Sequence, residues 1–412
     1  MTANIVWKAA EKAVITADIS TLRRLLRENK RLFRGQHPPA GGGGLRPDYS
    51  RGDAKSIILW NHHFESWQKF ADHLKAFRQK DSPVAQFEAA VDAIVAGKIP
   101  TLRRLLRHNP ELIRARSSRN HRATLLHYVG ANGVEYFRQK TPKNAVKVAE
   151  VLLQAGAEVD AMADMYSGST TLGLIATSIH PFLAGVQNAL IDTFLKHGAQ
   201  IDHANAAGNK QSIVNGCLAN GRPDAAEFLA KRGARLDLEG AAGVGRLNIV
   251  KSFFNEDGSL KPNATEAQMR SGFNWACEYG RTRVVEFLLQ TKFDFNQIHR
   301  GETGLHWAAY AGHVDVVKLL LKQKDRVDIK DERFSGTPLG WALYVWGESR
   351  PGPKRDRYYK VVSLLVAAGA QVDPAWINES DRGFPLDKRI GDDSRMRAAL
   401  NKISKVSTKC EH

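Results

Sequence analysis

The chain has 412 residues, of which 43% are hydrophobic and 25% charged, values typical of a soluble folded protein. This length suffices for one long solenoid or for two to three compact domains. No apolar run approaches the ~20 residues that span a bilayer, and charged residues interrupt the starting segment MTANIVWKAAEKAV, so we expect no membrane span and no secretion signal. The three cysteines lie at least 60 residues apart, which argues against a disulfide framework or a Cys-x-x-Cys metal site. We therefore expect a cytoplasmic protein without metal or cofactor.

The formal net charge of +17 is concentrated toward the amino terminus. Residues 1–130 hold 23 Lys and Arg against 11 Asp and Glu, whereas the remaining 282 residues hold 37 against 32. Such an asymmetry can mark a surface for nucleic acid or for an acidic partner. Because no aromatic-interleaved binding motif accompanies the charge, the simpler interpretation is a solvated helical face in a basic protein.

The heptapeptide TLRRLLR occurs at residues 21–27 and again at 101–107. In both copies the leucines recur at the i, i+3, i+4 spacing of a buried helical stripe, and the arginines fall off this stripe toward water. An alanine-rich segment precedes each copy, which predicts two degenerate helix pairs of one type. We interpret the arginines as solvating, with a phosphate-binding ridge as the alternative. The buried positions are Leu22, Leu25, Leu26, Leu102, Leu105 and Leu106, and the outward ones are Arg23, Arg24, Arg27, Arg103, Arg104 and Arg107.

Between the two copies, residues 34–53 are rich in Gly and Pro, which predicts a flexible loop or linker. The next segment, residues 54–77, places apolar and aromatic residues on one stripe of a predicted helix. We interpret this stripe as an amino-terminal cap, because the end units of a repeat array expose an apolar face that needs covering. Its members are Ile57, Ile58, Trp60, Phe64, Trp67, Phe70, Leu74 and Phe77.

The clearest repeated unit is ETGLHWAAYAGHVDVVKLLLKQKDRVD at residues 302–328. Apolar stripes on both sides of Gly312 predict a helix–turn–helix of about 33 residues. Its TGLH…AA…GH pattern, together with recurrent endings such as LLQAGAEVD and LLVAAGAQVD, resembles the ankyrin repeat. Glycine directly after a helix adopts the left-handed conformation that other residues resist, which explains the recurrent Gly-Ala of these endings.

The resemblance implies an all-α, ankyrin-type helical repeat solenoid. The segment FESWQKFADHL also resembles a short helix that precedes arrays in some bacterial ankyrin-repeat proteins. The array departs from regularity at inserts around residues 130–144, 178–188 and 347–359, and one hairpin loop is missing between Gly221 and Gly245. The predicted organisation is a helix pair at 1–33, a Gly/Pro-rich loop at 34–53, aromatic-rich capping helices at 54–80, a degenerate repeat at 81–119, the array at 120–373, and a partial repeat, capping helix and tail at 374–412.

No catalytic motif stands out in the sequence. It contains no G-x-S-x-G, and its GGGGL segment lacks the Lys-Ser or Lys-Thr of a phosphate-binding loop. His127 and His306 occupy the histidine position of the T-x-L-H pattern, which in ankyrin repeats links neighbouring loops through hydrogen bonds. We assign the recurrent Trp275, Trp307 and Trp341 to the core between repeats. Accordingly, we predict no catalytic, metal-binding or cofactor-binding residues.

The ankyrin resemblance implies a concave face made of loop tips and exposed positions of the first helices. Such a surface is large and rigid, so little ordering entropy is lost on binding. Mapping the repeats onto one another places Tyr279, Tyr310 and Tyr344 in a ladder, and tyrosine and arginine are enriched in binding hot spots. Alternatively, these tyrosines pack together and seal adjacent repeats. The predicted partner-binding residues are Glu278, Tyr279, His299, Arg300, Glu302, Tyr310, Arg333, Phe334 and Tyr344.

These observations predict a non-catalytic scaffold that binds a protein partner on the concave face of the array. One alternative is a nucleic-acid or polyanion binder that uses the Arg-rich amino-terminal third, and its affinity would fall steeply with salt. A second alternative is an enzyme with a site in an inserted loop, with residues 164–171 as the first place to look. A pocket lined by acids and histidines with perturbed pKa values would favour that alternative.

Overall fold

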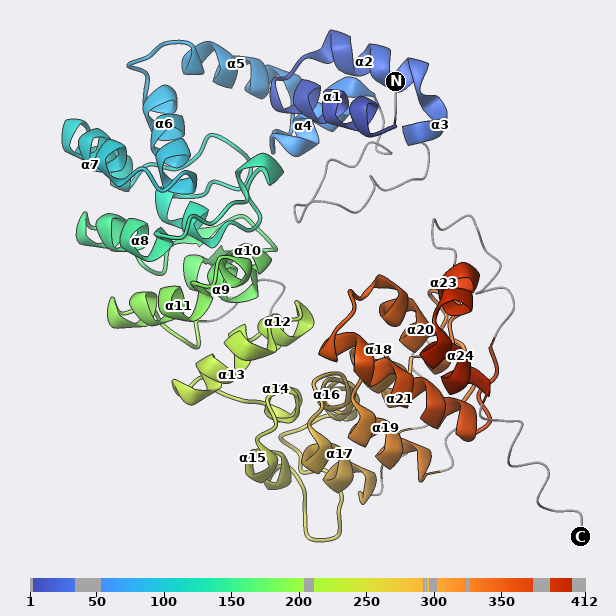
Figure 1. Cartoon of the computed structure of the whole chain (residues 1–412). Coiled ribbons are helices and arrows are strands. Elements are labelled where there is room, and N and C mark those ends of the chain that lie inside the picture. The colour runs from blue at the N-terminus through green and yellow to red at the C-terminus, as the bar shows by residue number, and fades with distance from the viewer. Residues whose placement is uncertain are drawn as a thin grey trace, which may run out of the picture. The chain divides into compact units, whose positions relative to one another are not determined.

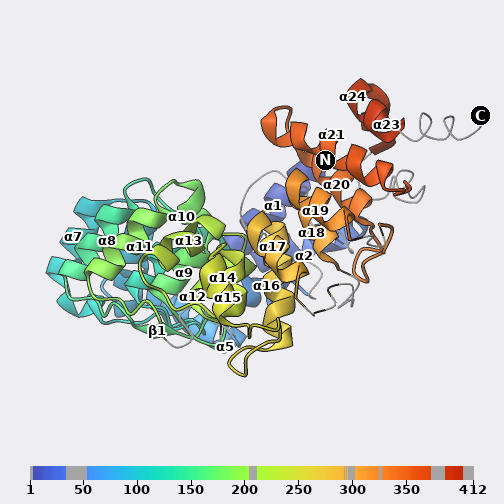
Figure 2. The same ribbon diagram turned by 90° about the horizontal axis from the view of Figure 1, so that it is seen from below.

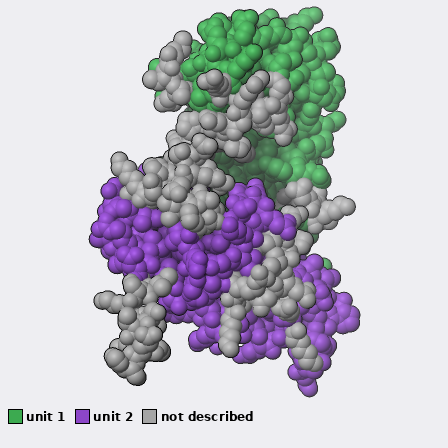
Figure 3. All heavy atoms as spheres, turned by 90° about the vertical axis from the view of Figure 1, so that its right-hand side faces the viewer, with its two compact units in different colours: residues 1–235 green, residues 236–412 purple. Residues whose placement is uncertain are grey.

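The chain folds as two compact units, residues 1–235 and 236–412 (Figure 3). Both consist almost entirely of helices, with one small hairpin of β1 (Met162–Ala163) and β2 (Ser169–Thr170), so the predicted all-α class is confirmed. No helix in the described part of the chain combines the length and the apolar character needed to cross a bilayer. The computed structural model describes residues 3–33, 53–203, 211–291, 293, 295, 302–323, 327–372 and 386–401.

Unit 1 is a row of helix pairs in which the second helices α7, α8, α11 and α13 lie side by side (Figures 1 and 2). The predicted insert at residues 178–188 holds the additional short helix α10. In chain order the helices are α1 (Ala3–Ile15), α2 (Ile19–Glu28), α3 (Lys30–Phe33), α4 (Ala54–Asn61), α5 (Trp67–Phe77), α6 (Pro83–Val95), α7 (Ile99–His108), η1 (Pro110–Ile113), η2 (Leu125–Gly130), η3 (Tyr136–Arg138), α8 (Ala145–Gln154), α9 (Thr171–Thr177), α10 (Ile179–Leu183), α11 (Gln187–Lys196), α12 (Ile213–Ala219) and α13 (Pro223–Lys231).

The two copies of TLRRLLR form the second helices of the predicted pairs, α1–α2 and α6–α7. The Asp18 carboxylate accepts a hydrogen bond from the backbone N–H of Thr21 at 3.0 Å and so caps the start of α2. Leu22 and Leu102 are fully buried, and all six arginines of the two copies are exposed. The interpretation of the leucines as core and the arginines as surface is confirmed.

The predicted stripe at residues 54–77 is wrong at Trp60 and Phe77, whose side chains are 47% and 46% exposed. The segment is not one helix: α4 ends at Asn61, His63 adopts a left-handed φ of 58°, and Ser66 caps the start of α5. This break rotates α5 relative to α4, so the periodicity of a single helix no longer applies. The buried members pack with the first helix pair, α1 and α2, in one core cluster.

The long connection at residues 130–144 positions a buried ionic cluster in unit 1. Glu88 of α6 and Glu135 form ion pairs with the guanidinium groups of Arg119 and Arg138, and none of these four side chains is more than 9% exposed. Asp92, whose side chain is 62% exposed, accepts from Arg138 Nη2 at 2.8 Å at the rim of the cluster. Burial acts to raise the pKa of Glu135, but the Arg119 guanidinium holds it well below its usual range.

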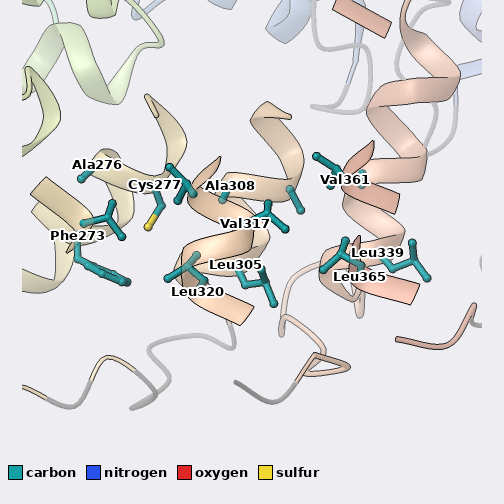
Figure 4. Close-up of a cluster of buried hydrophobic side chains, with 14 of the residues drawn as sticks. Phe273, Ala276, Cys277, Leu305, Ala308, Val317, Leu320, Leu339, Val361 and Leu365 are labelled. Atoms are coloured by element: carbon teal, nitrogen blue, oxygen red, sulfur yellow. The ribbon is translucent and has the colours of Figure 1, made fainter. Parts of the chain in front are cut away.

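Unit 2 continues the same arrangement, with the first helices α14, α16, α18 and α20 adjacent in sequence order and the second helices α15, α17, α19 and α21 beside them (Figure 1). Apolar side chains of successive repeats meet in one core cluster, as Phe273, Leu305 and Leu339 illustrate (Figure 4). The bounds are α14 (Leu238–Gly243), α15 (Leu247–Ser252), α16 (Glu266–Glu278), α17 (Thr282–Leu289), α18 (Gly304–Ala311), α19 (Val314–Leu321), α20 (Pro338–Glu348), α21 (Pro353–Ala367), α23 (Leu386–Asp392) and α24 (Ser394–Leu400).

The insert at residues 347–359 lengthens the helices instead of forming a long turn. Helix α20 ends at Glu348, and α21, which has 15 residues, begins at Pro353. Proline suits the first turn of a helix because its missing N–H has no partner there in any case. The predicted carboxy-terminal capping helix corresponds to α24, whose Met396 is fully buried against the core of unit 2. The predicted tail at 405–412 lies outside the described residues.

The aspartates that close the repeat endings link neighbouring repeats. Three of these side chains accept a hydrogen bond from a backbone N–H at the corresponding turn of the following repeat. Asp160, Asp202 and Asp328 accept from Gln200, Arg235 and Gln371 at 3.0, 2.9 and 3.2 Å, respectively. The Asp237 side chain caps its own helix, α14, through the N–H of Gly240 at 2.8 Å.

Candidate partner-binding face of unit 2

Three exposed aromatic side chains lie on adjacent repeats of unit 2. Tyr310 of α18, Phe334 of the loop before α20, and Tyr344 of α20 are 40%, 44% and 43% exposed. Burial, and then the neighbouring Tyr344 and Glu278, raise the pKa of Tyr310, which places these three side chains close together. Tyr279, at the end of α16, is partly buried. Glu278 and Tyr344 are thus electrostatic neighbours of Tyr310, and the role of these residues in partner binding stays a prediction.

Trp341 supports two of these side chains, Tyr310 and Phe334, from the core side. Its side chain is only 7% exposed, and its ring centroid lies 5.3 Å from Trp307, 5.8 Å from Tyr310 and 6.4 Å from Phe334. Tyr310 therefore packs on a buried tryptophan while two fifths of its surface remains exposed. It both contributes to the packing between repeats and presents part of its ring at the surface. Trp341 is buried as predicted, whereas Trp275 and Trp307 are only partly buried.

Asp331 shapes the loop that carries Arg333 and Phe334. Its buried carboxylate accepts the backbone N–H groups of Arg333, Phe334 and Gly336 at 2.9, 2.6 and 2.9 Å. A fourth hydrogen bond comes from Trp341 Nε1 at 3.0 Å. Burial opposes the charge, but these hydrogen bonds hold the pKa of Asp331 below its usual value. The Arg333 guanidinium lies over the Phe334 ring, 4.9 Å from its centroid, within cation–π range.

His306 has the structural role predicted for it, and His313 makes a similar link between repeats. His306 accepts the Thr303 N–H through Nδ1 at 3.2 Å and donates through Nε2 to the Gly336 carbonyl of the next loop at 3.1 Å. His313 donates through Nε2 to the Glu278 carbonyl of the preceding repeat at 2.9 Å. Gly280 has a φ of 68°, and a Cβ at this position would lie 2.6 Å from His313 Nδ1, so only glycine allows this approach.

Glu278 is a partly desolvated carboxyl within this face. Burial raises its pKa from 4.5 to about 7, and a hydrogen bond from the Tyr279 side chain only partly offsets that effect. The group is therefore incompletely ionised near neutral pH. Within the face it adds a titratable acid beside the exposed tyrosines.

At pH 8, replacing Glu278 with glutamine is expected to raise the free energy of unfolding by about 2 kcal/mol. The folded pKa lies above the unfolded value of 4.5, so the stability that the protonated carboxyl contributes is full below pH 4.5 and is lost as pH rises through about 7. At pH 8 the partly buried carboxylate is charged and destabilises the folded chain, and the neutral glutamine removes that cost. Urea denaturation at pH 4 and pH 8 measures the difference, with the exposed Glu286→Gln as the control. An equal change at both pH values would contradict this explanation.

Three residues of the predicted face do not join this group. His299 and Arg300 fall outside the described residues, and Glu302 is partly buried two residues before α18. Sequence reasoning missed Asp331, although an aspartate a few residues before a Ser-Gly pair between two helices is typical of a loop organised by its carboxylate. It also missed that Trp341 supports the exposed aromatic side chains, since periodicity marks burial without showing which neighbours a buried ring contacts.

Comparisons with known proteins agree with the helix pairs. The family model for ankyrin repeats (3 copies) matches residues 238–333 and 273–375. The E3 ubiquitin-protein ligase hecd-1 of Caenorhabditis elegans is 36% identical over 77 residues, which are 19% of this chain and 3% of that protein. Palmitoyltransferase Hip14 of Drosophila melanogaster is 32% identical over 112 residues, 26% of this chain and 16% of that protein. Target of rapamycin complex 2 subunit AVO2 of Saccharomyces cerevisiae is 25% identical over 162 residues, 38% of this chain and 35% of that protein.

The chain thus spans about a third or less of the length of these relatives. What it shares with them is a repeat module, and ankyrin repeats generally mediate interactions between proteins. The matched range contains α14 to α21 and the aromatic face described above. Residues 238–375 of unit 2 therefore form ankyrin repeats.

Proposed function

We propose that the chain is a non-catalytic scaffold that binds a protein partner on the face formed by Glu278, Tyr279, Tyr310, Arg333, Phe334 and Tyr344. The observation that carries the proposal is the presence of three exposed aromatic side chains on adjacent repeats, two of which, Tyr310 and Phe334, pack against the buried Trp341. Aromatic residues and arginine dominate binding hot spots because they bury a large area with few rotatable bonds. A supported, rigid aromatic surface of this kind loses little entropy on binding.

The relatives support a binding role that is separable from any one activity. Their names include an E3 ubiquitin-protein ligase, a palmitoyltransferase and a subunit of a target of rapamycin complex. The resemblance to the enzymes is confined to their ankyrin regions. We further propose a reducing, cytoplasmic location, in which the buried thiols of Cys217 and Cys277 would stay reduced.

The double variant Tyr310→Ala/Tyr344→Ala is expected to weaken binding to the partner by at least about tenfold, since hot-spot truncations cost about 2 kcal/mol or more. Partners are first identified by mass spectrometry on the immobilised full chain, and the dissociation constant is then measured with each purified partner. Ile249→Ala on α15, which is also exposed in unit 2, serves as the matched control. Binding that survives the double variant unchanged would place the partner elsewhere and refute this face.

A second candidate function rests on the exposed arginines of α2 and α7. All six are at the surface, and Arg24 pairs with Glu28 at 3.2 Å, so most of their charge is available to phosphates. Counterion release would make such binding salt-dependent, with log K falling by about 0.9 per phosphate contact for each unit of log salt. Duplex DNA titrated between 50 and 200 mM salt, with wild type and with Arg103→Gln/Arg104→Gln/Arg107→Gln, separates this function from the scaffold. Undetectable or salt-independent binding would exclude it.

A further inference from the structure

Unit 1 contains a cavity of about 340 Å³. Four segments distant in sequence form its walls: the end of α4 with the turn after it, the loop before η2, the connection around η3, and the turn between β1 and β2. This last turn belongs to the inserted loop at residues 164–171. The lining side chains that matter here are Trp60, His63, His121, Tyr136, Asp164 and Tyr166.

Backbone hydrogen bonds join the walls into one frame. The Asn120 N–H donates to the His63 carbonyl at 2.9 Å, and the Asp164 N–H donates to the His121 carbonyl at 2.8 Å. Tyr166 donates its hydroxyl to Asn132 Oδ1 at 2.8 Å, which fixes the ring. His63 and Tyr166 have φ values of 58° and 52°, a region that costs side-chain-bearing residues about 1–2 kcal/mol. The frame therefore holds two strained, bulky residues at the cavity wall.

The cavity is rimmed by aromatic rings. Trp60 is 47% exposed and Tyr166 42%, and Tyr136 is partly buried beside them. The negative face of an aromatic ring attracts cations, most strongly for tryptophan and tyrosine. Large exposed rings around a preformed cavity favour a ligand that covers them.

The charges around the cavity have the sign that suits a cation. Among the described lining residues, Asp164 carries a formal charge, and none is a lysine or an arginine, although the chain has 60 of these. Burial lowers the pKa of His63 to about 4, so this lining imidazole is neutral at physiological pH. His121 Nε2 lies 3.9 Å from Oε1 of the buried Glu135.

The ionic cluster behind His121 does not oppose this preference. Its buried carboxylates, Glu88 and Glu135, are balanced by the two guanidinium groups of Arg119 and Arg138. Asp164 therefore supplies the negative charge of the cavity lining.

We propose that this cavity binds an organic cation, an alkylammonium or guanidinium group, held against Trp60, Tyr136 and Tyr166 and neutralised by Asp164. Its volume lies near the lower end of the ~300–1,000 Å³ typical of small-molecule sites, so the bound group is small. The cation belongs either to a free small molecule or to a lysine or arginine side chain of another protein. Both sources present the same chemistry to the cavity.

Isothermal titration of the full chain with choline and with its neutral isostere 3,3-dimethyl-1-butanol, at constant ionic strength, tests the charge. N-acetyl-lysine amide and N-acetyl-arginine amide form the second arm. We expect at least one cation to bind about tenfold more tightly than the neutral compound. Tightest binding of choline would indicate a free ligand, and tightest binding of a capped amino acid would indicate a protein side chain. Equal binding of the isostere, or no binding of any cation, would overturn the proposal.

Substitutions of cavity residues test whether the cation binds in this cavity. Trp60→Ala and Asp164→Asn are each expected to weaken the cation about tenfold, whereas Trp60→Phe should retain most of the affinity because it keeps an aromatic face. Both positions are exposed, so the variants are expected to fold, which circular dichroism checks. Phe77→Ala, with 46% exposure on α5, is the matched control outside the cavity. Cation binding that is unchanged in both Trp60→Ala and Asp164→Asn would show that the cation binds elsewhere.

Discussion

Replacing Glu135 with glutamine is expected to destabilise unit 1 by about 3–5 kcal/mol. In the native cluster, two buried carboxylates balance the two buried guanidinium groups of Arg119 and Arg138. Glutamine keeps the shape of the side chain but removes one negative charge, which leaves a buried positive charge without its partner. Breaking a buried pair in this way costs far more than the pair contributes when intact, because the remaining charge is still desolvated.

Hydrogen–deuterium exchange measures this loss directly, through peptides that cover α6 and residues 117–138. The matched control is Asp92→Asn, which removes a carboxylate from the same Arg138 but on the exposed side of the cluster. Because that side chain is 62% exposed, we expect a change of about 1 kcal/mol or less. Similar losses for both variants would show that burial does not govern the strength of these ion pairs.

The pH dependence of unit 1 has a definite sign. The pKa of Glu135 is lower in the folded chain than in the unfolded one, because Arg119 and Arg138 favour the ionised form. Its stabilising contribution is therefore present above the unfolded pKa and is lost as pH falls through the folded pKa. Glu135→Gln should accordingly make the stability of unit 1 less sensitive to acid.

Replacing Asp331 with alanine is expected to destabilise unit 2 by about 3 kcal/mol, because hydrogen bonds to a charged acceptor contribute about 1.5–3 kcal/mol and buried donors would lose their partner. The substitution removes an acceptor shared by three backbone N–H groups and the Trp341 indole. Urea denaturation measures the loss, with the exposed Asp328→Ala as control. Asp331→Asn should fall between wild type and Asp331→Ala, since its amide oxygen can accept some of these hydrogen bonds without the charge.

The Asp331→Ala variant also distinguishes the effect of this loop on stability from its effect on partner binding. If the loop disorders while α18 and α20 remain intact, the proposed partner should bind more weakly because Arg333 and Phe334 lose their positions. Near-ultraviolet circular dichroism of the tryptophans would report a changed environment around Trp341. A variant that loses no stability and leaves this signal unchanged would contradict the role assigned to Asp331.

Sequence periodicity predicted the helix pairs well because each repeat buries the same positions. Leu22 and Leu102 are buried for the same reason, and the turn glycines after helices have the left-handed φ values that their position requires. Tyr310 and Tyr344 reached one face because equivalent positions in stacked repeats are neighbours. These features depend on local spacing, which a sequence displays directly.

Features that depend on contacts between distant segments were not predicted. The ionic cluster joins residues 88, 119, 135 and 138, which share no period and belong to different elements. The cavity likewise needs four separate segments to meet, and its histidines occupy no recognisable motif. The break at His63 was missed because an aromatic-rich segment with helical spacing gives no sign of a left-handed residue at its centre.

The aspartate links between repeats bear on how such a chain tolerates insertions. They join points that are 40, 33 and 43 residues apart, yet each connects the same place in one repeat to the same place in the next. A segment added between two anchor points is therefore accommodated outside the anchored turn, while the pitch of the stack is preserved. This separation of repeat length from stacking geometry gives evolution a way to add α10 or lengthen α21 without disturbing the repeats on either side.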